Sequence, residues 1–171
     1  MSARGSLVAL GIFVGIFLVG YETRETWAPL IIFHREPIDV ELKGVKMSLK
    51  GRWEVRSVRQ HRIDFLGLDG LKPIWMAVGS YDEAHPRVLA LLNESPSGTV
   101  EIQIEAAGYK FNKGSIMRLG HQKVVKLVGT DGIRKVLRID FPRERVAVVL
   151  HSKDLGPSEL EDFATRTLSL Q

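Results

Sequence analysis

The 171-residue sequence contains no cysteine, which excludes disulfide bonds, thiolate zinc sites and a cysteine nucleophile. It also contains no G-x-S-x-G elbow, no H-E-x-x-H zinc helix and no G-x-G-x-x-G or G-K-[ST] phosphate loop. These absences lead us to predict no catalytic residue, no metal ligand and no cofactor. We therefore expect a binding protein more than an enzyme.

Histidine is scarce and scattered. The five histidines lie far apart in the sequence, at His34, His61, His85, His121 and His151. No two of them are spaced to bind a metal ion from one helix or one turn. Asp82 and Glu83 form the one local acidic cluster beside a histidine, in front of Pro86, and such a cluster usually keeps a turn hydrated.

Leu7 to Tyr21 is an apolar segment of fifteen residues without a charged side chain. As a helix it would span roughly 22 Å at ~1.5 Å per residue, less than the ~30 Å hydrocarbon core of a bilayer. A short transmembrane signal-anchor, a cleaved signal peptide and a buried helix of a soluble protein remain open as interpretations. No Ala-x-Ala cleavage motif follows the segment, which favours an uncleaved membrane anchor over residues 1–21.

Charge indicates how this segment is oriented in the membrane. Arg4 and the amino terminus precede it, whereas Glu22 and Glu25 follow it. Because positive residues tend to stay in the cytoplasm, we expect a single-pass protein of the cell membrane with a cytoplasmic N-terminus and an extracytoplasmic C-terminal domain. Cleavage would instead give a secreted or periplasmic protein. Residues 22–37 are interpreted as a connector between the anchor and the domain.

Gly11 and Gly15 lie four residues apart within the apolar segment. This G-x-x-x-G spacing lets two membrane helices approach closely. Glycine is also frequent in transmembrane and signal segments in general, so the pair is a candidate helix-packing site on spacing alone.

From Ile38 onward, apolar residues recur at every second position, as in strands that bury one face. The alternation is clear in Ile38–Leu42, Val45–Leu49 and Thr99–Ala106. We predict a mostly β domain over residues 38–171, an antiparallel β-sandwich or partly open barrel of roughly seven to nine strands. Ile74–Val78 is apolar throughout, which predicts a strand buried on both faces.

Turn signals separate the later strands. Asn112–Ser115 is predicted as a turn. Thr130-Asp131-Gly132 is predicted as the turn of a hairpin, because Asp-Gly readily adopts positive φ. Arg87–Asn93 fits either a short helix or a strand.

The chain ends in a predicted amphipathic helix over residues 158–170. Leu160, Phe163 and Leu168 follow helical spacing, so one face of this helix is expected to pack on the sheet. Ser158 is the predicted N-cap, with Glu161 completing a capping box.

The segment between Glu41 and Arg62 is basic. Alternation places Lys46 and Lys50 on the polar face of one strand and Arg52 and Arg56 on that of the next. Adjacent strands lie ~4.8 Å apart, so these four side chains are a candidate patch for anionic lipid or an acidic polymer. The alternative is a solvated sheet face or an edge protected by charge.

The formal net charge of +4 does not by itself indicate nucleic acid, and no strand of the RNA-binding type is present. We predict a membrane-anchored, non-enzymatic binding or assembly module, an accessory subunit of a larger envelope complex. Its expected partners are the lipid bilayer and other protein subunits. Two alternatives stay open. An envelope enzyme built from distant strands requires a pocket where a histidine and a carboxylate converge, and a carrier of an apolar ligand requires an internal cavity of ~300 Å³ or more.

Overall fold

A computed structural model describes residues 36–171 as a mostly β structure with two helices, α3 and α4. The strands are β1 (Ile38–Leu42), β2 (Val45–Leu49), β3 (Trp53–Arg59), β4 (Arg62–Asp69), β5 (Lys72–Ser80), β6 (Val100–Ala106), β7 (Tyr109–Leu119), β8 (Gln122–Thr130), β9 (Lys135–Phe141), β10 (Val146–Ser152) and β11 (Leu168–Leu170). The helices are α3 (Pro86–Glu94) and α4 (Pro157–Thr167). The predicted mostly β class is confirmed.

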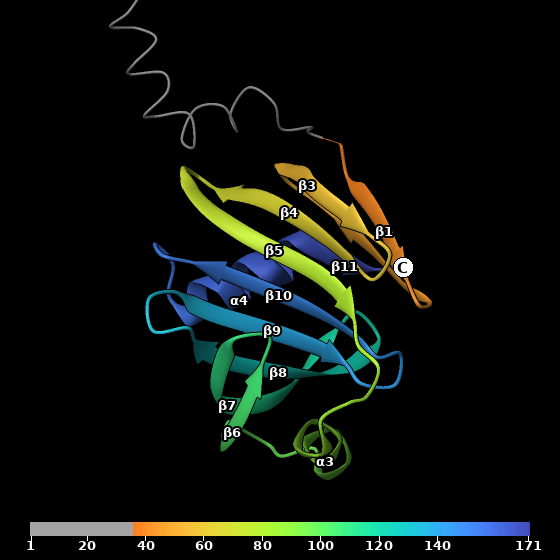
Figure 1. Ribbon diagram of the computed structural model, residues 1–171, viewed down its shortest axis with the longest axis vertical. Coiled ribbons are helices and arrows are strands. Elements are labelled where there is room, and N and C mark those ends of the chain that lie inside the picture. The colour runs from red at the N-terminus through yellow and green to blue at the C-terminus, as the bar shows by residue number, and fades with distance from the viewer. Residues whose placement is uncertain (1–35) are drawn as a thin grey trace, which may run out of the picture. The chain divides into compact units, whose positions relative to one another are not determined.

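The strands form two antiparallel sheets (Figure 1). The larger has eight strands in the order β3-β4-β5-β10-β9-β8-β7-β6, and the smaller has three in the order β1-β2-β11. Two meanders, β3 to β5 and β6 to β10, join through the antiparallel pairing of β5 with β10. Segments far apart in the sequence therefore meet in the middle of the large sheet.

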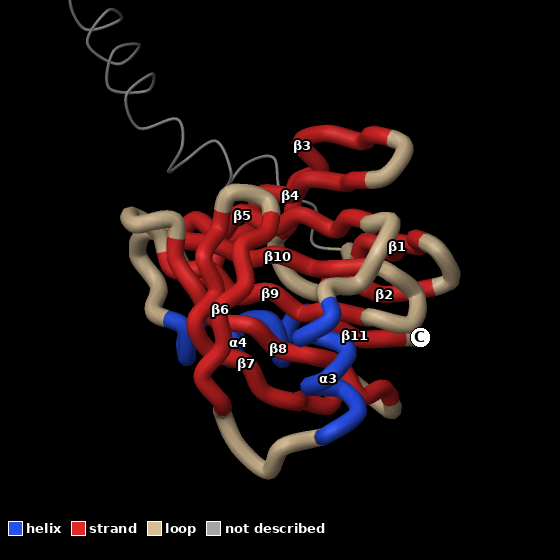
Figure 2. The backbone as a smooth tube through the Cα atoms, turned by 60° about the horizontal axis from the view of Figure 1, so that its bottom comes forward, coloured by secondary structure: helices blue, strands red, loops and turns tan. Residues whose placement is uncertain are grey.

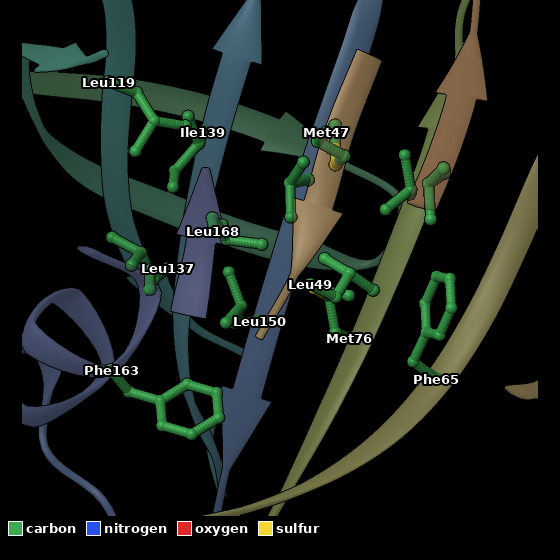
Figure 3. Close-up of a cluster of buried hydrophobic side chains, with 14 of the residues drawn as sticks. Met47, Leu49, Phe65, Met76, Leu119, Leu137, Ile139, Leu150, Phe163 and Leu168 are labelled. Atoms are coloured by element: carbon green, nitrogen blue, oxygen red, sulfur yellow. The ribbon is translucent and has the colours of Figure 1, made fainter. Parts of the chain in front are cut away.

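One face of the eight-stranded sheet, which we name the inner face, is covered by α4 and the three-stranded sheet. Alternating residues of β5, β9 and β10 point into this core, among them Met76, Ile139 and Leu150. Figure 3 shows how they meet Leu49 of β2 and Phe163 of α4. The period-two pattern of the sequence is thus explained by one continuous apolar layer between the two sheets.

The C-terminal helix is confirmed, but its predicted cap and end are wrong. The N-cap is Gly156, whose backbone N–H donates to the Glu159 carboxylate at 2.7 Å. Pro157 occupies the first turn, where a missing N–H costs nothing, and this explains the earlier start. Leu168–Leu170 leave the helix and pair with β2 as β11.

Arg87–Asn93 falls within helix α3. His85 is its N-cap, and its Nδ1 accepts a hydrogen bond from the Arg87 N–H at 3.2 Å. Val88 and Leu91 of α3 pack on the other face of the large sheet, which we name the outer face. They cover its β6–β9 side only, which leaves the β4, β5 and β10 side without a helix.

The two turn predictions have different outcomes. The hairpin between β8 and β9 is confirmed, and the Asp131 carboxylate accepts hydrogen bonds from the backbone N–H groups of Ile133 and Arg134. The turn predicted at Asn112–Ser115 is wrong, because these residues lie inside β7. The strand has a bulge there, between Phe111 and Lys113, which explains the broken alternation.

The predictions for residues 1–21, and nearly all of the 22–37 connector, concern residues outside the described part. The same holds for Gly11 and Gly15. Within the described part, neither α3 nor α4 is long and apolar enough to cross a membrane.

Candidate functional site

The uncovered side of the outer face contains a cavity of about 330 Å³, which we name the Trp75 pocket. Its lining residues are Arg56, Ser57, Arg62, Asp64, Trp75, Met76, Ala77, Ala107, Tyr109, Val149 and His151. They come from β3, β4, β5, β10 and the β6–β7 hairpin, so no local stretch of the sequence contains the site.

The floor of the pocket is formed by the two central strands. Trp75 of β5 lies directly across from His151 of β10, and Ala77 lies across from Val149. Residues two apart on a strand share a face, so all four side chains line the outer face. Ala77 and Val149 are small, which leaves room beside the indole ring of Trp75.

One wall is the β3–β4 hairpin. β3 contains a bulge between Val55 and Ser57, where Arg56 is the extra residue. Consecutive residues of a regular strand point to opposite faces, but a bulge changes this. Arg56 and Ser57 consequently both line the pocket, opposite Arg62 and Asp64 of β4.

The other wall is the tip of the β6–β7 hairpin, which rises over the outer face (Figure 2). Ala107 and Gly108 both have positive φ, 54° and 81°, so the tip is a tight two-residue turn. Near this tip, Gly129 of β8 pairs with Phe111 of β7, and a Cβ on Gly129 would lie 2.8 Å from the Cα of Phe111. Only glycine permits this close approach of the two paired strands beside the β7 bulge.

Asp64 is held in its ionised form by two hydrogen bonds. Ser57 Oγ donates to Asp64 Oδ2 and Arg62 Nε donates to Asp64 Oδ1, both at 2.7 Å. Burial opposes the charge, but these hydrogen bonds and the arginine charge outweigh it and lower the pKa of Asp64. A carboxylate in this state accepts hydrogen bonds and is a poor proton donor.

His151 is neutral in the pocket. Burial, and then the positive charge of Arg134, lower its pKa from 6.5 to about 4, with Asp131 opposing and Arg62 adding to the effect. Its ring faces that of Tyr109, with centroids 6.0 Å apart. The Nδ1 atom is buried and makes no hydrogen bond within the described structure. His151 therefore has an unpaired polar atom that is buried beside the pocket.

A second polar cluster lies on the same face, on β9. Arg138 donates two hydrogen bonds of 2.7 Å to Asp140, through Nε and Nη2, and its guanidinium lies 5.5 Å from the ring centroid of Tyr81. Burial and the Asp140 charge raise the pKa of the Tyr81 hydroxyl. The Asp140 side chain is almost fully buried, so we interpret the cluster as structural.

The four residues of the predicted basic patch do not lie on adjacent strands. Lys46 is on β2 of the three-stranded sheet and Arg56 is on β3 of the eight-stranded sheet. Lys50 and Arg52 lie in the connection between them, where Gly51 with φ of 105° turns the chain from one sheet to the other. Binding of an anionic surface by these residues stays a prediction, but the four side chains do not share one face of two adjacent strands.

Two members of that patch already have acidic neighbours. Lys46 is 3.5 Å from Glu41, and Arg56 is 3.0 Å from Glu54. Among residues 36–171, no group of three histidine, aspartate or glutamate side chains is placed to hold a metal ion.

Sequence reasoning missed the centre of the pocket. It predicted Ile74–Val78 as buried on both faces, yet Trp75 is 43% exposed. Trp75 lies between the core residues Ile74 and Met76, and the next residue on its own face is the small Ala77. This pattern could have indicated that one face of the strand is open. Comparison of the chain with protein-family models, curated protein sequences and solved structures finds no match, so the site's geometry is the basis for assigning a function.

Proposed function

We propose that the protein is a membrane-anchored, non-enzymatic binding or assembly module, an accessory subunit of a larger envelope complex. In this proposal, residues 1–21 are a single transmembrane helix and the β-rich domain, a sandwich or partly open barrel, is extracytoplasmic. The domain presents the Trp75 pocket to a partner. The observation that carries the proposal is the exposed Trp75 on the floor of a walled pocket, on a central strand of the sheet.

An exposed tryptophan on a central strand calls for an explanation. Burial of a large aromatic ring stabilises a fold or an interface more than most side chains do, and tryptophan is frequent among residues that dominate protein interfaces. Here α3 covers only the neighbouring part of the outer face. A partner that fills the pocket would bury the ring and the apolar floor beside it.

The pocket supports binding better than catalysis. His151 and Asp64 both line it, as the enzyme alternative requires. However, Asp64 is engaged by Ser57 and Arg62, and His151 Nδ1 has no carboxylate partner among the described residues. A histidine base is normally oriented by a third group and contacts its nucleophile, and this arrangement is missing.

The carrier alternative is also less well supported. The volume meets the threshold of ~300 Å³, but the walls contain Arg62 and Asp64. An apolar cargo would cover charged groups without giving them partners, which is unfavourable. A ligand with its own polar group suits this lining better.

Co-purification from membranes tests the proposal. The full chain and two variants, Trp75→Ala and Leu71→Ala, are extracted from native membranes in mild detergent, and the accompanying proteins are quantified by mass spectrometry. Leu71 is the matched control, because it is 64% exposed in the β4–β5 turn and does not line the pocket. We expect a defined set of envelope proteins with the full chain and with Leu71→Ala, and its loss with Trp75→Ala. A monodisperse, partnerless monomer would contradict the proposal.

A further inference from the structure

We propose that the Trp75 pocket takes an acidic aromatic anchor from the partner protein: one aromatic side chain against Trp75, with a neighbouring carboxylate on Arg62 and Arg56. This inference rests on the proposed function and specifies the chemistry of the partner. It follows from two features of the pocket, which are its apolar floor and its arginines.

The floor suits a flat ring. Trp75, Ala77 and Val149 form an apolar surface on β5 and β10, with Tyr109 on the opposite side. Aromatic rings prefer offset or edge-to-face contact with other aromatic rings, and the pocket is lined by two of them, Trp75 and Tyr109. A cavity of about 330 Å³ is at the small end for ligand sites, which fits one large side chain and its backbone.

The arginines retain free donors. Arg62 uses Nε on Asp64, and Arg56 uses Nη2 on Glu54. A guanidinium has five N–H donors, so each arginine keeps further N–H groups for a ligand. Arg62 has a 55% exposed side chain, which leaves these groups accessible. A planar guanidinium binds a carboxylate through two parallel hydrogen bonds, whereas a neutral amide lacks the charge.

The charge around the pocket favours an anion. Arg62 and Arg59 both act on the charge of Asp64, and Arg56 pairs with Glu54, so three arginines accompany two carboxylates here. Arg134 and Asp131 also act on His151, but they pair with each other and add no net charge.

The test uses two probes that differ in one charge. N-acetyltryptophan carries an indole ring and a carboxylate, and N-acetyltryptophanamide carries the same ring without the charge. Their dissociation constants are measured by ligand-observed NMR on the full chain in lipid nanodiscs, with empty nanodiscs as background. We expect N-acetyltryptophan to bind about fivefold or more tightly than the amide, as one partly exposed charged hydrogen bond allows.

Three variants assign the binding to this site. Arg62→Gln is expected to remove the preference for the carboxylate while the amide still binds. Trp75→Ala is expected to abolish binding of both probes. Arg143→Gln, an exposed arginine in the β9–β10 turn that does not line the pocket, is the control and should leave both constants unchanged. Thermal unfolding of each variant shows that it is folded.

Three results would each overturn the inference. They are equal affinity for the two probes, an unchanged preference for the carboxylate in Arg62→Gln, and no binding of either probe up to about 10 mM. This limit follows from the ~millimolar affinities of such small ligands. Such results leave the co-purification experiment standing on its own. If partners are still lost with Trp75→Ala while the probes do not bind, the partner uses a different chemistry. If the probes bind but no partner co-purifies, the subunit proposal fails and the pocket chemistry holds.

Discussion

Trp53 and Trp75 lie on strands of the same sheet and point to opposite faces. Trp53 is 1% exposed, packs on Phe65 and Phe163, and its indole N–H donates to the Lys50 carbonyl at 3.1 Å. Trp75 is 43% exposed and lies between Leu66 and His151 of the neighbouring strands. The same residue type thus completes the core on one face and leaves an open surface on the other.

The comparison extends to the two faces as a whole. The buried centre of the inner face is apolar across β4, β5, β10 and β9, and its ion pairs with α4, Lys72–Glu159 and Asp69–Arg166, lie at exposed positions. The outer face is interrupted by Asp64 with Arg62 and by Asp140 with Arg138. Charged pairs contribute little to stability when solvated and are costly to bury without partners. We infer that the inner face, together with the side of the outer face under α3, determines the stability of the fold, whereas the uncovered side of the outer face is available for binding.

Replacement of Trp53 is expected to have the largest effect on stability. Trp53→Ala would leave a cavity between β3 and α4 and lower the free energy of unfolding by about 3–5 kcal/mol. Urea unfolding of the full chain in nanodiscs, followed by circular dichroism, measures this change. A loss below about 1 kcal/mol would contradict the assignment of Trp53 to the core, because surface substitutions are typically that small.

Trp75→Ala is expected to destabilise the fold by less than half of that amount, about 1–2 kcal/mol, because only part of the indole ring leaves an apolar environment. The same variant should lose probe binding and partner proteins. Trp75→Phe keeps an aromatic ring, so it should recover most of the stability and part of the binding. A loss of stability equal to that of Trp53→Ala would remove the distinction between the two faces.

The sequence predicts the inner face well and the outer pocket poorly, for a physical reason. Alternation within one strand is local, so it indicates which residues of Ile38–Leu42 or Val45–Leu49 are buried. The β8–β9 hairpin is local too, because its Asp131-Gly132 turn is contained in the sequence between the strands. These features require no knowledge of which strands meet.

The pocket depends on contacts between distant segments. Trp75 meets His151 only because β5 pairs with β10, and Tyr109 reaches His151 from the distant β6–β7 hairpin. The expected placement of the basic residues on adjacent strands is wrong for a related reason. A glycine turn suggested adjacent strands, but Gly51 directs β2 and β3 into different sheets, and the Lys50 N–H donates to Thr167 at the end of α4.

The smallest expected effect is a pH dependence that belongs to the outer face alone. The pKa of His151 is about 4 in the folded protein and 6.5 in the unfolded chain, because burial and Arg134 disfavour its charged form. Between these values the unfolded chain binds more protons, so stability decreases as the pH falls from about 6.5 to about 4. Since the imidazole is partly exposed and solvent screens its interactions, we expect a loss of about 1 kcal/mol over this window.

Urea unfolding at several pH values measures this loss, with His151→Gln as the reference. The difference between the two curves should be constant above pH 6.5 and change below it, because only the protein with His151 loses this stability. If the difference in unfolding free energy between the two proteins does not change with pH, the pocket does not hold His151 neutral. This pH dependence would then not distinguish the outer face from the inner face.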